Sequence, residues 1–181
     1  MKPGKAATIL ALAAGSMLAG CTMNGGPAAV AGSDRAASAT AAMRTSDGRE
    51  AGTAVATAEH GGVRVVIEAK ALPPGLHGAH VHTVGRCDAP DFTTAGGHWN
   101  PMTTKHGSRN PAGPHAGDLP NLTVGSDGRG KLSMMLPAGT LDAMLDADGA
   151  ALVVHATADD LMSDPAGNSG GRIACGVFTV G

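Results

Sequence analysis

From residue 51 to the C-terminus, hydrophobic and polar residues alternate in short runs, which is the pattern of β-strands. The first two runs cover residues 53–72 and divide at Gly61-Gly62, a two-residue hairpin signal. A second hairpin is predicted over residues 121–136, with Asp127-Gly128 in its turn. The remaining strands are expected within residues 79–85, 150–157 and 172–180. The pattern therefore predicts an all-β fold.

Two long segments rich in Gly and Pro, residues 85–118 and 156–171, separate these strands. Loops of this length are uncommon unless they carry function or are tied down. Residues 139–150 have room for a helical turn, but their Gly, Asp and Ala residues favour a loop. Several short strands with turn signals between them point to a sandwich or a barrel.

The N-terminus is predicted to be a targeting segment. Residues 1–20 combine two lysines with a short apolar run, which is typical of a secretory signal and too short for a spanning helix. The following Cys21 completes "LAGC", which resembles the bacterial lipobox; the alternative is an ordinary signal with an incidental cysteine. Residues 21–50 are then a lipidated cysteine and a flexible tether, because they are rich in Ala, Gly and Ser. We expect a folded domain at 51–181, in the periplasm, with the lipid as the one membrane contact.

Composition and charge narrow the function. The formal net charge of −2, an aromatic content of 2% and the lack of any Lys/Arg cluster argue against a nucleic-acid-binding protein. With Cys21 assigned to lipid, Cys87 and Cys175 remain in a chain exported to an oxidising compartment. Such a pair predicts a disulfide, and two unpaired buried thiols are the alternative.

Histidines mark the candidate chemistry. His80 and His82 are two residues apart in a strand-like run, so both side chains leave the same face and can chelate one metal ion. His77 has the opposite parity and is not expected to point with them. An isolated His-x-His pair is weak evidence by itself.

The segment 85–118 strengthens the metal hypothesis, because it holds four more candidate ligands: His98, His106, His115 and Asp118. Three imidazoles and one carboxylate complete a tetrahedral zinc site with no open position, which is a structural arrangement. Scattered surface histidines are the alternative. His155 ends a buried strand, and taken alone it is more typical of a hydrogen-bonded core residue.

Six motifs resemble those of copper/zinc superoxide dismutases, in the same order and at roughly the same spacing. They are "GLHGAHVH", "GGHWNP" with the following "KHG", "PHAGDLPN", "LVVHATADD" and "GGRIACG". The similarity covers nearly all of residues 51–181, and the exported form resembles bacterial periplasmic members. The resemblance implies an eight-stranded Greek-key β-sandwich or barrel, immunoglobulin-like, with two long functional loops.

The resemblance also implies ligands. The copper ligands would be His80, His82, His98 and His155; the zinc ligands would be His98, His106, His115 and Asp118. Asp159 would hydrogen-bond one ligand of each metal, and His77 would hydrogen-bond the backbone. Cys87 and Cys175 would tie the metal loop to the last strand.

The implied activity is conversion of superoxide to dioxygen and hydrogen peroxide, with copper and zinc as cofactors. His98 would bridge the metals and carry a proton, and Arg172 would attract and orient the anion. A non-catalytic copper store or chaperone on the same fold is the main alternative, but such domains usually lose copper ligands or the arginine. A structural or adhesive lipoprotein would leave the histidine pattern unexplained.

Two departures from the animal enzymes limit the resemblance. The segment 156–171 contains no Lys or Arg, so the loop that steers the anion is short and lacks its cations. Three other residues are candidate steering cations: Arg86, Lys105 and Arg109. The segment between Cys87 and His98 is also longer, and in bacterial relatives it contributes to a different subunit contact. Either a monomer or a homodimer is therefore expected.

Overall fold

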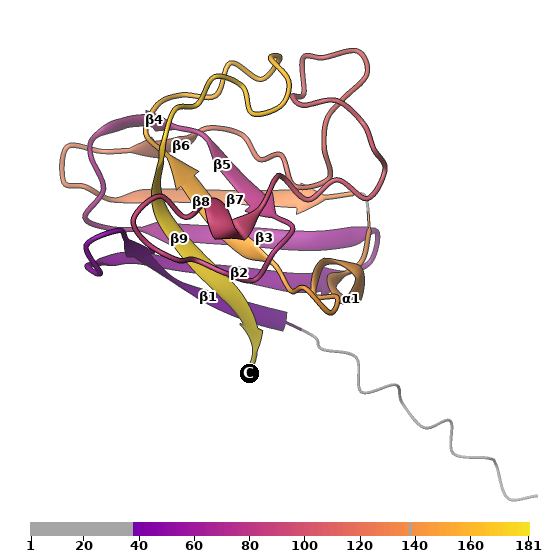
Figure 1. Ribbon diagram of the computed structural model, residues 1–181, viewed down its shortest axis with the longest axis horizontal. Helices are drawn as coiled ribbons and strands as arrows, with labels where there is room; N and C mark the ends of the chain where they lie inside the picture. Colours follow the sequence, from indigo (N-terminus) through magenta and orange to yellow (C-terminus); the bar gives the residue numbers. More distant parts are fainter. Residues whose placement is uncertain (1–37, 138) are drawn as a thin grey trace, which may run out of the picture. The chain divides into compact units, whose positions relative to one another are not determined.

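The structure is a computed structural model that describes residues 38–137 and 139–181 (Figure 1). The predicted signal, the lipidation site Cys21 and the first part of the predicted tether lie outside these residues. Within the described ranges, none of the helices has the length and apolar character needed to cross a bilayer.

In the part of the chain that the structure describes, nine antiparallel strands form a single sheet in the order β4-β6-β7-β3-β2-β1-β9-β8-β5. Their bounds are β1 Ser38–Thr45, β2 Glu50–Glu59, β3 Gly62–Ala69, β4 Gly75–His77, β5 Ala79–His82, β6 Leu122–Val124, β7 Gly130–Leu136, β8 Ala151–His155 and β9 Arg172–Val180. The first and last strands of this order, β4 and β5, are separated in the chain only by Gly78. The sheet therefore closes on itself as a barrel (Figure 1).

The predicted all-β fold and both predicted hairpins are confirmed. β2 pairs with β3 from Gly52↔Ala69 to Glu59↔Gly62, and β6 pairs with β7 around the predicted turn. The strand count is nine instead of eight, because residues 75–82 pair with β6 before Gly78 and with β8 after it. A helical turn, α1 Leu141–Met144, stands where we expected a loop, since the Thr140 side chain caps its N-terminus.

Strand β1 corrects the predicted tether. We expected a flexible chain up to residue 50, but β1 Ser38–Thr45 lies inside the sheet between β2 and β9. Its inward-facing residues are Ala39, Ala41 and Met43, which are all buried. Two of these three are alanines, so the alternation of the strand carries little hydrophobic contrast and resembles an Ala-rich linker.

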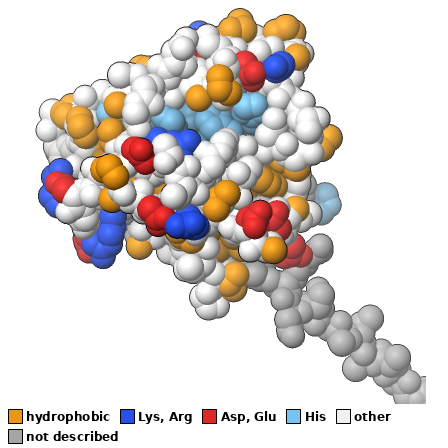
Figure 2. Space-filling model, viewed as in Figure 1, with side chains coloured by type: hydrophobic (Ala, Val, Ile, Leu, Met, Phe, Trp, Pro, Cys, Tyr) orange, Lys and Arg blue, Asp and Glu red, His pale blue; other side chains and the backbone are white. Residues whose placement is uncertain are grey.

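The barrel interior is aliphatic, as the composition required. On β3, Val63, Val65 and Ile67 alternate with partly exposed neighbours and are essentially inaccessible. The segment 156–171 and the later part of the segment 85–118 lie together above the strands in Figure 1, and the first part of 85–118 passes in front of them. Figure 2, seen from the same side, shows histidine side chains at the floor of a hollow, with Lys or Arg atoms beside them.

Candidate metal centre

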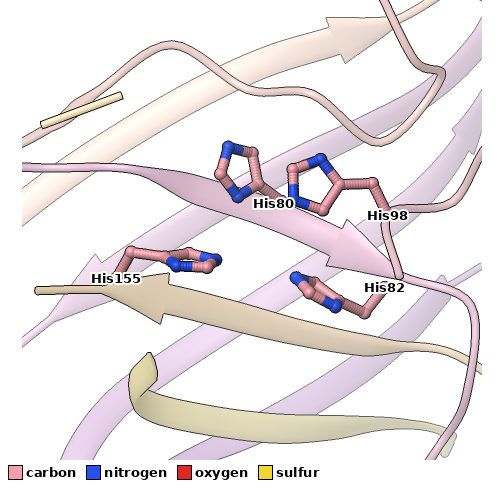
Figure 3. A group of neighbouring side chains, drawn as sticks. All are labelled: His80, His82, His98 and His155. Carbon is pink, nitrogen blue, oxygen red and sulfur yellow. The ribbon is translucent and has the colours of Figure 1, made fainter. Parts of the chain in front are cut away.

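Four buried histidines meet where the loops cover the sheet (Figure 3). His80 and His82 extend from β5, and His155 is the last residue of β8, the strand that pairs with β5. His98 comes from the segment 85–118 and forms an isolated bridge with His82. One ring nitrogen from each of the four lies within 4.8 Å of the others. The structure thus brings together the four histidines that the resemblance implied as one group.

Each of these imidazoles uses one ring nitrogen to fix its orientation. His82 Nδ1 is 2.9 Å from the Gly96 carbonyl oxygen, and His155 Nδ1 is 3.0 Å from that of Gly170. A neutral imidazole that donates one N–H exposes a lone pair at the other nitrogen. In both residues this second nitrogen is Nε2, and it faces the centre of the group.

The opposite nitrogens have no partner. Over the described ranges, the buried side-chain nitrogen and oxygen atoms without a hydrogen bond are all histidine ring nitrogens: His80 Nδ1, His82 Nε2, His98 Nε2, His106 Nδ1 and His155 Nε2. An unsatisfied buried polar atom costs about 1–3 kcal/mol. Four of them, from His80, His82, His98 and His155, belong to one group and fit a metal ion, which would accept these lone pairs. The fifth, His106 Nδ1, is 3.1 Å from Asp118 Oδ2.

Burial keeps the histidine rings of the first group uncharged. It is the main cause that lowers the pKa of His80 to about 3, that of His82 to about 2 and that of His155 to about 4. The nearby His98 lowers all three further. At neutral pH these rings therefore carry free lone pairs, which is the form that binds a metal.

A second group adjoins the first. The ligand atoms of His80, His98, His106 and Asp118 lie within 4.8 Å of one another. His80 belongs to this set through its ring, which stacks on His98 at a centroid distance of 3.9 Å. The predicted zinc ligand His115 is not in the set. His115 is nevertheless close, since its Nδ1 is 3.3 Å from both His98 Nδ1 and Asp118 Oδ1.

The second group is electrostatically suited to a cation. Burial alone would lower the pKa of His106, but the carboxylates of Asp118 and Asp159 outweigh it and raise this pKa to about 9. Burial opposes ionisation of Asp118 as well, yet His106, His98 and the Gly107 N–H keep the pKa of its carboxyl far below the usual range. A charged carboxylate thus stands beside His98, His106 and His115, and it holds a positive charge on His106 that a bound cation would replace.

Asp159 connects the two groups. Its Oδ2 is 2.7 Å from His80 Nε2, and its Oδ1 is 3.0 Å from His106 Nε2. This is the double contact that the resemblance implied. By holding the outer nitrogen of each ring, the carboxylate turns His80 Nδ1 and His106 Nδ1 inward.

Two residues that sequence reasoning missed hold Asp159 in place. Asn121 donates from Nδ2 to the Asp159 carbonyl at 2.8 Å and accepts the Asp159 N–H at Oδ1 over 2.7 Å. Gly167 has a φ of 62°, and a Cβ there would lie 1.8 Å from Asp159 Oδ1. Asn121 ends the motif "PHAGDLPN" and Gly167 lies in a loop, but nothing local in either place indicates a contact with Asp159.

Comparison with known proteins decides the family. The family model described as copper/zinc superoxide dismutase matches residues 50–178. A superoxide dismutase [Cu-Zn] of Aquifex aeolicus is 45% identical over 136 residues, covering 72% of this chain and 80% of the relative. One from Caulobacter vibrioides is 43% identical over 148 residues, covering 78% and 85%. The crystal structure of a SOD-like protein from Bacillus subtilis superposes with a TM-score of 0.73 at 39% identity, covering 77% of this chain and 97% of that one.

The chain belongs to the copper/zinc superoxide dismutase family. It is therefore an oxidoreductase that acts on superoxide and uses copper and zinc. The barrel and the two histidine groups of this dismutase agree with that membership.

His77 has a different part in the dismutase from the other histidines of "HGAHVH". Its Nδ1 is 2.8 Å from the carbonyl oxygen of His155, and its Nε2 is 2.8 Å from that of Pro73. Both ring nitrogens face backbone oxygens, so neither is free for a metal. The predicted bracing role of His77 is confirmed.

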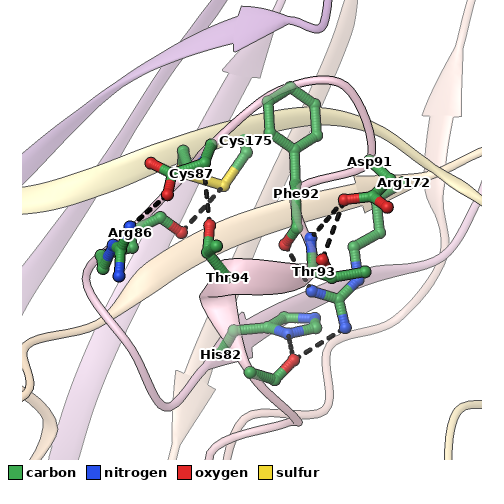
Figure 4. The surroundings of a disulfide bond; sticks show 11 residues. His82, Arg86, Cys87, Asp91, Phe92, Thr93, Thr94, Arg172 and Cys175 are labelled. Carbon is green, nitrogen blue, oxygen red and sulfur yellow. Dashed lines mark hydrogen bonds and ion pairs between the residues drawn. A yellow bond between two sulfur atoms is a disulfide. The ribbon is translucent and has the colours of Figure 1, made fainter.

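Arg172 lies beside His82 in the dismutase (Figure 4). Its Nη1 donates to the Phe92 carbonyl at 2.6 Å, and its Nη2 donates to the Gly96 carbonyl at 2.7 Å. The Gly96 carbonyl also accepts from His82, so one oxygen positions both His82, a member of the four-histidine group, and Arg172.

The predicted disulfide between Cys87 and Cys175 is present, with the two Cα atoms 5.7 Å apart (Figure 4). It joins the start of the segment 85–118 to β9, the strand that begins with Arg172. Phe92 packs in the same small cluster as Cys175. The covalent link and the two bonds from the guanidinium group therefore fasten the same loop to the same strand.

The three candidate steering cations of the dismutase differ in their partners. Arg86 forms an exposed ion pair with Asp88, and Lys105 forms one with Asp164. Across residues 38–137 and 139–181, no ion pair or side-chain hydrogen bond is found for Arg109.

Proposed function

We propose that this dismutase binds copper through His80, His82, His98 and His155, and zinc through His98, His106, His115 and Asp118. For copper, the observation that carries the assignment is the set of four unpartnered buried ring nitrogens that converge on one point. For zinc, it is the adjoining group of imidazoles around the Asp118 carboxylate. His98 belongs to both groups and offers Nε2 to the first and Nδ1 to the second, so it is the bridging residue.

Distances in the second group support zinc and the inclusion of His115. A tetrahedral site with Zn–N bonds of about 2.0–2.1 Å places neighbouring ligand atoms about 3.3 Å apart. His115 Nδ1 stands 3.3 Å from His98 Nδ1 and 3.3 Å from Asp118 Oδ1. His106 Nδ1 is 3.1 Å from the other carboxylate oxygen of Asp118.

A bound copper ion supplies the redox chemistry, because nitrogen ligands suit Cu(II) and it can pass an electron from one superoxide to another. The chain supplies the placement of substrate and protons. The Arg172 guanidinium is held by two carbonyls beside His82, where it attracts and orients the anion. We assign His98 Nε2 as the atom that holds one of the two protons that peroxide formation consumes.

Metal analysis of the purified protein tests the ligand assignment. We expect about one copper and one zinc per chain after loading, and His106→Ala will lose zinc. The exposed His60, on the turn between β2 and β3, provides the matched control, because His60→Ala leaves both metals bound. Zinc binding without any copper binding would contradict the assignment.

We further propose that the enzyme works in the bacterial periplasm, attached to a membrane by a lipid on Cys21. The lipobox-like "LAGC" and the apolar run before it support the anchor, and the Cys87–Cys175 disulfide fits an oxidising compartment. In fractionated cells, Cys21→Ser will move the protein from the membrane fraction to the soluble periplasmic fraction. Unchanged membrane association would exclude Cys21 as the anchor.

A further inference from the structure

We call residues 161–164 the strap and residues 98–118, which hold the proposed zinc ligands, the zinc loop. The strap lies across the part of the zinc loop that contains His106. Three described hydrogen bonds hold the strap there: Arg109 N–H to the Leu161 carbonyl at 2.9 Å, Asn110 Nδ2 to the Met162 carbonyl at 3.2 Å, and His106 N–H to Asp164 Oδ1 at 2.8 Å. The strap thus contacts the zinc loop with backbone and side-chain groups together.

Gly107 allows this close approach. Its φ is 97°, and a Cβ at this position would lie only 2.2 Å from the Leu161 carbonyl oxygen. A larger residue would push the two segments apart. The short segment 156–171, which lacks the cations of a steering loop, therefore packs tightly on the zinc loop.

Asp164 gives the strap its charge. One oxygen, Oδ1, accepts the His106 N–H and stands 3.8 Å from His115 Nε2. The other, Oδ2, accepts from Lys105 Nζ at 3.0 Å. The carboxylate therefore joins the backbone of His106, the side chain of Lys105 and the outer edge of His115.

We propose that Asp164 is a second positioning carboxylate of the zinc site, in addition to Asp159. It fixes the backbone of one zinc ligand, His106, and places a negative charge behind the outer nitrogen of another, His115. At 3.8 Å this carboxylate makes no hydrogen bond to His115, but its negative charge raises the basicity of the ligating imidazole. This inference rests on the zinc assignment proposed above.

A simple surface ion pair with Lys105 is the competing explanation, and exposed pairs of this kind contribute little. The two explanations predict different consequences of removing each partner. If the carboxylate serves the zinc ligands, the loss of Asp164 weakens zinc binding and the loss of Lys105 does not. If only the ion pair matters, the two losses are equivalent.

The test measures zinc affinity by competition with a chromogenic chelator, on the purified full chain. Four variants are compared with the wild type: Asp164→Ala, Asp164→Asn, Lys105→Met and Glu68→Gln. Asp164→Asn keeps an oxygen for the His106 N–H but removes the charge. Glu68→Gln breaks another Lys–carboxylate ion pair, a more exposed one with Lys131 that lies away from the histidine groups, and is the control.

We expect Asp164→Ala to raise the dissociation constant for zinc by about 10–100-fold, the range for loss of an outer carboxylate partner. Asp164→Asn will fall between Asp164→Ala and the wild type, and the other two variants will stay within about twofold. Cobalt(II) in place of zinc gives a second readout, because its visible spectrum reports ligand geometry. This spectrum should change in Asp164→Ala and remain that of the wild type in Lys105→Met.

Wild-type affinity in Asp164→Ala, or equal losses in Asp164→Ala and Lys105→Met, would overturn the role of Asp164 and leave the zinc assignment intact. A wild-type chain that binds no zinc would overturn both. Thermal unfolding of the zinc-free proteins excludes a folding defect: Asp164→Asn should unfold at the temperature of the wild type, and a large decrease would refute the positioning role.

Discussion

Replacing His155 with alanine will abolish superoxide dismutation and leave zinc bound. His155 contributes its free Nε2 to the four-histidine group and has no place in the group around Asp118. Copper would therefore lose one of four ligands, whereas the zinc ligands would remain complete. The measurements are superoxide decay after pulse radiolysis and the content of each metal.

Two controls separate loss of a ligand from loss of structure. His155→Gln keeps most of the side-chain volume in this buried position but removes the imidazole. A similar loss of activity therefore identifies the missing imidazole nitrogen as the cause. His60→Ala removes an exposed histidine of the β2–β3 turn and should remain fully active. Wild-type activity in His155→Ala would mean that copper is held by other residues.

Replacing Arg172 with glutamate will lower the second-order rate constant by about 10–100-fold and weaken its dependence on ionic strength. The guanidinium is held beside His82 by the carbonyls of Phe92 and Gly96. A glutamate there repels the anion that the arginine attracts. The measurement is the superoxide decay rate over a range of salt concentrations.

Lys131→Glu provides the matched control for net charge. It changes the charge of the protein by the same amount, but on β7, where Lys131 pairs with the exposed Glu68. We expect it to retain most of the activity. Arg172→Lys should be intermediate, because it keeps the charge but loses the two-pronged contact. An unchanged rate in Arg172→Glu would refute the guiding role.

The fold was largely predictable because strong alternation marks most strands. Val63, Val65 and Ile67 on β3 show the period of two that a half-buried strand requires. β1 was missed because its inward positions are mainly alanines, which are also typical of linkers. The split of residues 75–82 into β4 and β5 depends on which distant strands each part meets, and local sequence does not contain that information.

The metal site was likewise predictable in some residues and not in others. Parity along one strand separated His80 and His82 from His77, and the structure confirms that His77 binds the backbone. The contributions of Asn121 and Asp164 were not predictable, because each acts on a segment more than 35 positions away in the sequence. Such contacts follow from how two irregular loops pack, for which no periodic pattern exists.

Superoxide decay by the metal-loaded protein, measured before and after selective removal of copper, tests the central claim most directly. The claim is that this chain dismutates superoxide at a copper ion held by four buried imidazoles next to a zinc ion. We predict rapid second-order decay with the loaded protein, loss of that activity on copper removal with zinc retained, and recovery when copper is restored. Equal decay rates for the copper-loaded and copper-free proteins would contradict the account.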